Sequence, residues 1–437
     1  MVEARLRVGL GIVILSGPTQ NLMRFAIFLV VLLTALAGLN AFVYKRLTAL
    51  WGLETRGRRV VVGILSFGLV AMVLGRTIGR ASPSPVAVAL SASGSAIQLA
   101  AIVTFAVLAV ERLAARIVGL GSWIWRRART GSAEELAMET VGSTERVDAP
   151  EPSATDDGDG IGRREMMGRA LGAAAVGLGA APAAYGALFG RHDYAIEEVP
   201  VRLAELPPAL DGFTIVQLSD VHLGMFVGEP ELKSMMEMVR RAKPDAIVLT
   251  GDLIDNDPRY VDMLGSMARR LGEQAPVYAI PGNHDYYAGI GATTNALREA
   301  GAGVLVNSAT RIAEGKVALL GVDDVWAKRY GRGGGPDVLK AAAHLPREIP
   351  RVLLCHNPVY FPEAAPHIDL QLSGHTHGGQ YNPGGLRPAD LVLPFGYVAG
   401  RYDRDGAKLW VNRGFGTAGP PARVGAPPEI TKVILTS

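Results

Sequence analysis

The sequence predicts an N-terminal α-helical membrane region followed by a C-terminal α/β domain. Hydrophobic residues make up 49% of the 437 residues, and the mean hydropathy of +0.22 is high because apolar residues are concentrated in the first third of the chain. A polar, acidic segment separates that third from the remainder. Beyond Tyr194, short β-rich runs alternate with segments of helical periodicity, which is typical of an α/β domain.

Three apolar segments follow one another near the N-terminus. They cover Phe25 to Tyr44, Val60 to Gly75, and Ala81 to Val110, the last holding a span near Val86–Val110. Arginine or lysine flanks the first two, and a segment of about 20 apolar residues is long enough to cross a bilayer. A buried helix of a soluble protein would explain one such segment but not three in succession. We therefore expect residues 1–125 to form a transmembrane region of about three spans, in contact with the bilayer.

Residues 126–162 are predicted to be a disordered acidic linker, because they are polar and show no apolar periodicity. In residues 163–190, Arg163-Arg164 precedes the uncharged segment Ala170 to Gly190. This arrangement fits a twin-arginine signal placed internally, with the twin-arginine export machinery as a partner. It fits equally an ordinary arginine pair before a fourth span.

The distribution of basic residues predicts the orientation of the spans. The loop from Lys45 to Arg59 and the segment from Arg112 to Arg129 each carry five basic residues, whereas the loop between the second and third spans carries Arg76 and Arg80. Basic loops face the cytoplasm. We therefore expect a multi-pass protein of the bacterial inner membrane whose chain beyond residue 190 lies on the extracytoplasmic side.

Composition excludes several classes of function. The formal net charge is only +3, and no basic patch interleaved with aromatic residues is present, so we expect no nucleic-acid partner. The single cysteine, Cys355, excludes an intramolecular disulfide and a multi-cysteine metal site. A lone thiol on a predicted strand is typical of a small core residue.

Residues 194–437 show the pattern of a catalytic α/β domain with mixed strands. Helical periodicity predicts helices at Glu231–Ala242 and Tyr260–Leu271. The predicted strands are Phe213–Leu218, Ala246–Thr250, Val277–Ile280, Val317–Leu320, Val352–Leu354, Leu370–Leu372, Lys408–Val411 and Ile430–Leu435.

Five of these strands are followed, at their carboxyl ends, by residues of the types that bind metal ions. The carboxyl edge of an α/β sheet is the usual place for an active site. Residues two apart, such as His375 and His377, share a face of an extended segment. Adjacent glycines let the loops bring the side chains together. The five sequences are Asp220-Val221-His222, Gly251-Asp252-Leu253-Ile254-Asp255, Gly282-Asn283-His284-Asp285, Cys355-His356-Asn357 and Gly374-His375-Thr376-His377.

The mixture of carboxylate, imidazole and amide groups suits borderline divalent ions such as Mn, Fe or Zn. So many ligands in one domain favour two ions over one. Two metals a few ångströms apart can clamp the attacking and leaving oxygens of a phosphoryl transfer.

In their order along the chain, these motifs resemble those of the calcineurin-like metallophosphoesterase superfamily. The resemblance implies a four-layer α/β/β/α sandwich with mixed sheets. Further strings, from Ser373 to Gln380, from Asn412 to Thr417 and from Gly425 to Thr431, resemble its bacterial membrane-associated branch, which includes phosphodiesterases and UDP-2,3-diacylglucosamine hydrolases of lipid A synthesis.

The superfamily resemblance also implies roles for individual residues. One metal would be held by Asp220, His222, Asp252 and His377, and the other by Asp252, Asn283, His356 and His375. His284 would stabilise charge in the transition state or protonate the leaving oxygen. Asp255 would orient His284. Asp285 is expected to support the ligands without binding metal.

The implied function is hydrolysis of a phosphodiester or pyrophosphate bond in a lipid-linked or cell-envelope substrate. A phosphomonoesterase or general phosphodiesterase acting on soluble phosphorylated molecules is an alternative, as is an inactive membrane-tethered sensor. Arg413 and Arg423 could contact substrate phosphate or form structural ion pairs, and the sequence leaves both open.

Overall fold

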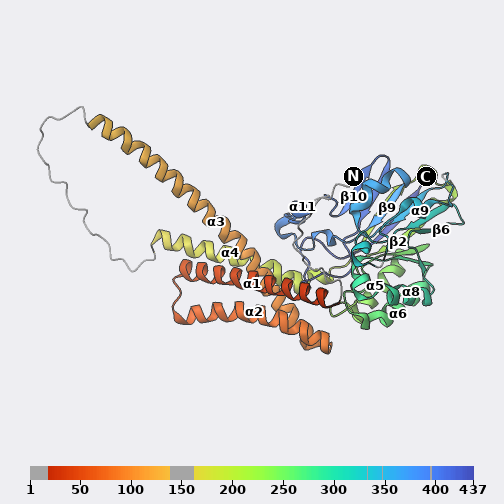
Figure 1. Cartoon of the computed structure of the whole chain (residues 1–437), viewed down its shortest axis with the longest axis horizontal. Helices are drawn as coiled ribbons and strands as arrows, with labels where there is room; N and C mark the ends of the chain where they lie inside the picture. Colours follow the sequence, from red (N-terminus) through yellow and green to blue (C-terminus); the bar gives the residue numbers. More distant parts are fainter. Residues whose placement is uncertain (1–17, 138–161, 332, 347, 394–395) are drawn as a thin grey trace, which may run out of the picture. The chain divides into compact units, whose positions relative to one another are not determined.

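The computed structural model describes residues 18–137 and 162–437, except positions 332, 347, 394 and 395 (Figure 1). These residues divide into two compact units. The first unit comprises residues up to 65 together with 101–176, and the second comprises residues 66–100 together with 177–437. Three long helices therefore contribute residues to both units.

Four helices within the described residues are long and apolar enough to cross a membrane. In the first unit, an apolar cluster joins them through residues such as Val43, Leu65, Leu108 and Ala175, and Arg46 pairs with Glu111 at 2.5 Å. The helices are α1 (Pro18–Trp51), α2 (Thr55–Ala81), α3 (Pro85–Ala137) and α4 (Arg163–Leu188).

The predicted apolar segments largely coincide with these helices, but residues 82–84 of the third segment form the loop between α2 and α3, the fourth segment passes the end of α4 at Leu188, and α3 extends further than expected. The linker was predicted to begin at residue 126, whereas the helix continues to Ala137. Most residues of this extension are Arg, Ala, Glu or Leu, which have high helix propensity. The segment is therefore helical although its composition is polar. The remaining predicted linker residues, 138–161, lie outside the described residues.

The C-terminal α/β domain contains two mixed six-stranded sheets. The first has the order β1-β12-β2-β3-β4-β5, in which β12 runs antiparallel to β2 but parallel to β1. Its strands are β1 (Ala195–Arg202), β2 (Thr214–Leu218), β3 (Ala246–Thr250), β4 (Val277–Ile280), β5 (Gly303–Val304) and β12 (Glu429–Thr436).

The second sheet has the order β10-β11-β9-β8-β7-β6. Its four central strands are parallel, and both edge strands are antiparallel to their neighbours. The strands are β6 (Ser308–Ile312), β7 (Val317–Gly321), β8 (Arg351–Leu354), β9 (Leu370–Ser373), β10 (Gly400–Arg404) and β11 (Ala407–Val411).

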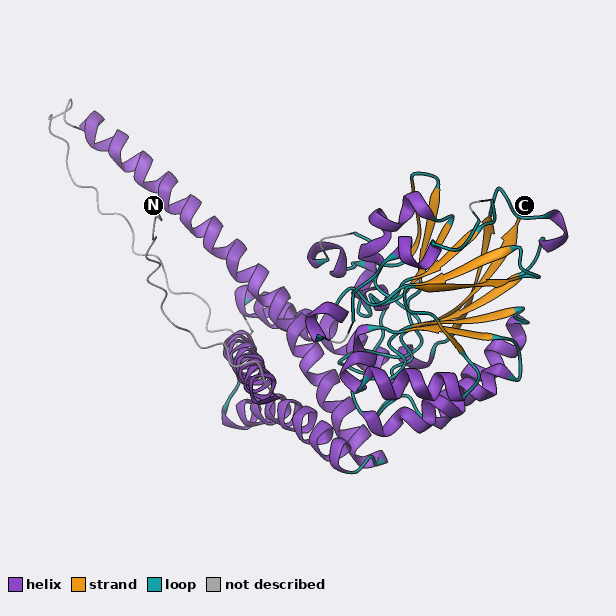
Figure 2. Ribbon diagram, turned by 45° about the vertical axis from the view of Figure 1, so that its right-hand side comes forward, coloured by secondary structure: helices purple, strands orange, loops and turns teal. Residues whose placement is uncertain are grey.

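The two sheets and the helices that cover them form four layers (Figure 2), and three apolar cores hold these layers together. Between the sheets, Ile215 and Val248 of the first pack with Leu319 and Leu372 of the second. Because successive side chains of a strand point to opposite faces of its sheet, each sheet also has an outer face, and helices cover it. Helices α5 (Glu229–Ala242), α6 (Val261–Gly272) and α8 (Ile290–Glu299) cover the first sheet. The shorter α9 (Val338–Ala342) and α10 (Phe361–Ala364) cover the second. This architecture confirms the predicted fold class.

Candidate metal centre

The first group of candidate ligands consists of Asp220, His222 and His377, whose ligand atoms all lie within 4.8 Å of one another. The Nε2 atoms of His222 and His377 are 3.1 Å apart, and His377 Nε2 is 3.4 Å from Asp220 Oδ1. All three residues are buried. The loops after β2 and β9 thus direct two imidazoles and a carboxylate to one point between the two sheets.

The second group consists of Asp252, His356 and His375, from the loops after β3, β8 and β9. His356 Nε2 lies 3.2 Å from Asp252 Oδ2 and 3.2 Å from His375 Nδ1. Asp252 Oδ2 also lies 3.9 Å from His222 Nε2 in the first group. The Asp252 carboxylate is therefore within reach of both groups.

Asn283 brings an unsatisfied amide oxygen to the same region. It begins the short helix α7 (Asn283–Ala288) after β4, and only 7% of the residue is exposed. Its Oδ1 has no hydrogen-bond partner among the described residues. A buried acceptor without a partner is costly. A cation near Asp252 would satisfy it, so the donor set fits divalent metal ions.

Five of the candidate ligands adopt a left-handed backbone conformation that is rare for non-glycine residues. The φ angles are 51° at Asp220, 50° at His222, 53° at Asp252, 71° at His375 and 52° at His377. Such conformations cost free energy and concentrate at functional sites. They turn each chain sharply at the end of its strand, so that the ligands point into the space between the sheets.

Asp285 holds two of these loops together, as expected for a supporting residue. Its buried carboxylate accepts hydrogen bonds from the backbone N–H groups of Leu253, Ile254 and Gly282 at 2.8–3.2 Å. Burial and the nearby charge of Asp252 raise the pKa of Asp285 to about 6. This carboxylate therefore fixes the loop that carries Asp252 relative to the loop that carries Asn283.

His284 and Asp255 form a hydrogen-bonded pair beside the two groups. His284 Nδ1 lies 2.6 Å from the backbone oxygen of Asp255 and 3.4 Å from its Oδ1. The backbone N–H of His284 donates to Asp252 Oδ1 at 2.8 Å. Burial opposes protonation of His284, but the hydrogen bonds that its ring donates to Asp255 and the charge of Asp252 outweigh burial and raise the pKa to about 9.

The electrostatics of the site favour the neutral imidazole at two of the candidate ligands, His375 and His377, whereas the charge of Asp252 and a hydrogen bond to it outweigh burial and raise the pKa of His356. Burial, followed by the positive charge of His356, lowers the pKa of His375 to about 3. Burial, then the charges of His222 and Arg423, hold the pKa of His377 well below its usual value. Metal binding requires the deprotonated imidazole. At neutral pH these two side chains are therefore already in the form that binds a cation.

Three other residues considered from the sequence have structural partners. Arg423 is buried, and its guanidinium donates to the carbonyl groups of Gly414, Gly416 and Ala426. Its Nη2 also lies 3.1 Å from His377 Nδ1. Arg413 pairs with Glu197 and Glu429, and Cys355 is buried in the core behind β8. Both arginines therefore make structural contacts, which is one of the two alternatives that the sequence leaves open.

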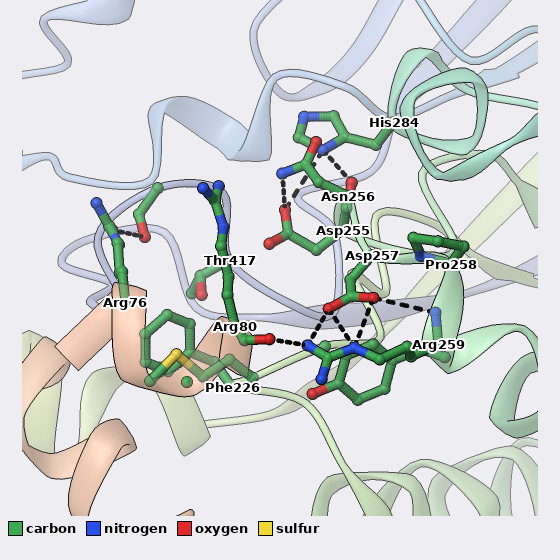
Figure 3. Close-up of a pocket in the computed structure, with 15 residues that line it drawn as sticks. Arg76, Arg80, Phe226, Asp255, Asn256, Asp257, Pro258, Arg259, His284 and Thr417 are labelled. Carbon is green, nitrogen blue, oxygen red and sulfur yellow. Dashed lines mark hydrogen bonds and ion pairs between the residues drawn. The ribbon is translucent and has the colours of Figure 1, made fainter. Parts of the chain in front are cut away.

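A cavity of about 490 Å³ adjoins His284 and Asp255 (Figure 3). Its wall includes Arg76 and Arg80 from α2 and Phe226 from the loop after His222. Sequence reasoning did not include these residues in the site. From the sequence, the two arginines are expected only to flank an apolar span, and no sequence signal connects them with His284.

Removal of divalent metal is expected to destabilise the full-length protein. Without a cation, the clustered imidazoles and carboxylates and the unsatisfied Asn283 oxygen remain buried, which costs free energy. Chelation should lower the midpoint of thermal unfolding by about 5 °C or more, and Mn²⁺ should restore it. Differential scanning fluorimetry in detergent would measure this. An unchanged midpoint after verified metal removal would contradict a structural contribution from metal.

Comparison of this sequence with known proteins finds similar phosphoesterases. The family model for calcineurin-like phosphoesterases matches residues 213–379. An uncharacterized metallophosphoesterase of Aquifex aeolicus (strain VF5) is 32% identical, over 55% of this chain and 91% of that protein. The uncharacterized metallophosphoesterase YkuE of Bacillus subtilis (strain 168) is also 32% identical, over 63% of this chain and 98% of that protein.

A membrane protein is among the relatives. The transmembrane protein with metallophosphoesterase domain of Danio rerio is 36% identical over 58% of this chain, but the match spans only 60% of its own length. The similarity to the two bacterial proteins extends over nearly their whole length. The chain belongs to the calcineurin-like metallophosphoesterases and is a metal-dependent hydrolase.

Proposed function

We propose that the protein is a membrane-anchored phosphodiesterase or pyrophosphatase that acts on a lipid-linked or cell-envelope substrate. The observation that carries the hydrolytic part is the position of Asp252. Its carboxylate lies 3.2 Å from His356 and 3.9 Å from His222, between two groups of candidate ligands. Both distances are to Oδ2, and a carboxylate shared between two groups of ligands would suit a site for a pair of metals.

The metal ligands in this proposal are Asp220, His222 and His377 on one side, Asn283, His356 and His375 on the other, and Asp252 between them. Two divalent cations supply Lewis acidity, which lowers the pKa of water and offsets charge on the phosphoryl oxygens. The imidazole-rich donor set suits Mn, Zn or Fe better than Mg or Ca. The strained loops hold the ligands in place before substrate arrives.

His284 is proposed to act as the general acid. Its Nδ1 is hydrogen-bonded to Asp255, which leaves Nε2 as the atom that transfers a proton. Asp255 is proposed to fix the orientation of the ring and to favour its protonated form. When the phosphorus–oxygen bond to the leaving group breaks, the proton on Nε2 passes to that oxygen. An alcohol or phosphate then leaves in neutralised form.

Contacts within the second unit support a location of the catalytic domain beside a membrane surface. Arg76 Nη2 at the end of α2 donates to the carbonyl of Gly419 at 2.6 Å. The backbone N–H of Arg423 donates to the carbonyl of Gly186 near the end of α4 at 3.1 Å. Both contacts involve the helix ends opposite the basic loops, which favours the extracytoplasmic face of a bacterial inner membrane. Arg163-Arg164 at the start of α4 keeps twin-arginine export as one proposed route.

A substrate panel tests the proposal. The full-length protein in detergent with Mn²⁺ would be assayed with p-nitrophenyl phosphate, bis(p-nitrophenyl) phosphate, UDP-glucosamine and UDP-2,3-diacylglucosamine. We expect kcat/KM for the diester to exceed that for the monoester by about tenfold, and the diacylated nucleotide to be preferred to UDP-glucosamine by a similar factor. Preference for the monoester would instead identify a phosphomonoesterase. No hydrolysis of any compound would favour a sensor.

A further inference from the structure

The cavity beside His284 is bordered by the end of a membrane helix. Arg76, Gly79 and Arg80, in the last turns of α2, lie along one side of it, and His284 and Asp255 lie along another. All of these residues belong to the second compact unit. A substrate whose scissile phosphate reaches His284 would therefore extend past this helix end.

Three contacts hold the helix end against the catalytic loops. Arg76 donates to the carbonyl of Gly419, and Arg259 Nη2 donates to the carbonyl of Arg80 at 2.6 Å. Gly79 packs so closely on Met225 that an added Cβ would lie 2.7 Å from Met225 Cε. The position of the two arginine side chains relative to the site is thus set by several independent interactions.

The two arginines present positive charge to the cavity. They are four residues apart on a helix, so their side chains share a face. Figure 3 shows both extending from α2 on the side where Asp255 and His284 lie. Asp255 and Asp257 line the same cavity, but among the residues that the structure describes no carboxylate forms an ion pair with Arg76 or Arg80. Arg259, in contrast, is paired with Asp257.

The remaining wall of the cavity is partly apolar. Met225 and Phe226 are half-buried in the loop after His222, and Tyr260 lies beside them in the cavity lining. On α2 itself, Leu74 and Ile78 remain exposed. An anionic group bound by the arginines would therefore have apolar surface next to it, as an amphiphilic molecule requires.

We infer that Arg76 and Arg80 form an anion subsite that binds a second phosphate, adjacent to the scissile one, of an amphiphilic diphosphate. This inference rests on the proposed function and specifies its substrate class. Guanidinium groups bind phosphate oxygens through paired, charge-assisted hydrogen bonds. The metal centre would hold the phosphate under attack, and the helix would hold the next one. A membrane helix thereby supplies specificity for the diphosphate, which a soluble catalytic domain would lack.

Direct binding measurements test this inference without requiring turnover. Decyl methylenediphosphonate carries two phosphonate groups and resists hydrolysis, and decyl phosphonate carries one. Calorimetry would measure the Kd of each ligand for the full-length protein in zwitterionic nanodiscs, with each ligand equilibrated with Mn²⁺ beforehand. The ratio of the two Kd values gives the preference for the diphosphonate. We expect the preference for the diphosphonate to fall about tenfold in Arg80→Gln and in Arg76→Gln.

Arg59→Gln is the matched control, since Arg59 is an exposed arginine at the other end of α2. It should retain the wild-type preference. A wild-type protein without preference, or a preference that persists in both cavity variants, would overturn the inference. An effect that appears only in nanodiscs containing phosphatidylglycerol would also overturn it, because the arginines would then bind bulk lipid headgroups. Failure of the proposed function would show separately, as absence of diphosphate hydrolysis in the substrate panel.

Discussion

Replacing Asp252 with alanine is expected to abolish hydrolysis, with kcat/KM falling by about a thousandfold or more. The Asp252 carboxylate is within reach of both groups of ligands, through His356 and His222. Its other oxygen accepts a hydrogen bond from the backbone of His284. Loss of this carboxylate would remove a ligand from both cations and release the histidine that is proposed to donate the proton.

The measurement combines kinetics with metal content. The rate of bis(p-nitrophenyl) phosphate hydrolysis would be followed with Mn²⁺ in excess, and bound metal would be quantified by mass spectrometry. We expect the variant to retain fewer metal ions per chain than the wild type. Asp262→Ala provides the control, because Asp262 is an exposed aspartate on α6 away from the candidate ligands. Activity that survives in Asp252→Ala would show that the metal assignment is wrong.

Much of the catalytic domain could be predicted because its buried strands are short, continuous apolar runs. The runs at Ala246–Thr250 and Val277–Ile280 are strands with those bounds. The edge strands were missed for the same physical reason. Strand β10 (Gly400–Arg404) is largely exposed and rich in charged residues, so it carries no apolar signal. The first strand, Ala195–Arg202, contains two glutamates and a proline and is recognisable only by its pairing with β12.

The site was predictable in its residue types, but the spacing of those residues along the chain did not give its geometry. Sequence spacing alone suggested that His375 and His377 face one point because they are two apart on an extended segment. In the structure the two histidines belong to different groups. Both have positive φ angles, so the segment is not extended and the simple alternation of a strand does not apply. Tertiary contacts, including Asp220 accepting from the backbone of His375, impose this turn.

The cavity residues Arg76 and Arg80 were not predictable at all from local pattern. They are separated from His284 by about two hundred positions, and arginines at the end of an apolar span have a sufficient explanation in membrane topology. Only the docking of α2 onto the loops near Arg259 and Gly419 brings them to the site. Such long-range contacts leave no trace in composition or periodicity.

Replacing His284 with glutamine is expected to have an effect that depends on the leaving group. For a substrate with an alcohol leaving group, kcat should fall by about 10²–10³, because the departing oxygen must be protonated as its bond to phosphorus breaks. For a p-nitrophenolate leaving group, which is stable as an anion, the loss should be about tenfold or less. The comparison uses methyl p-nitrophenyl phosphate against a dialkyl phosphate, with Mn²⁺ present.

This dependence separates two roles that the sequence leaves open for His284. A residue that only stabilises charge on the phosphoryl group would act on both substrates, and its removal would slow them equally. A proton donor affects chiefly the poor leaving group. His344→Gln serves as the control because His344 is exposed outside the motifs. The raised pKa of His284, about 9, keeps the ring protonated at neutral pH. Its hydrogen bond to Asp255 leaves Nε2 available, so these two properties together favour the proton-donor result.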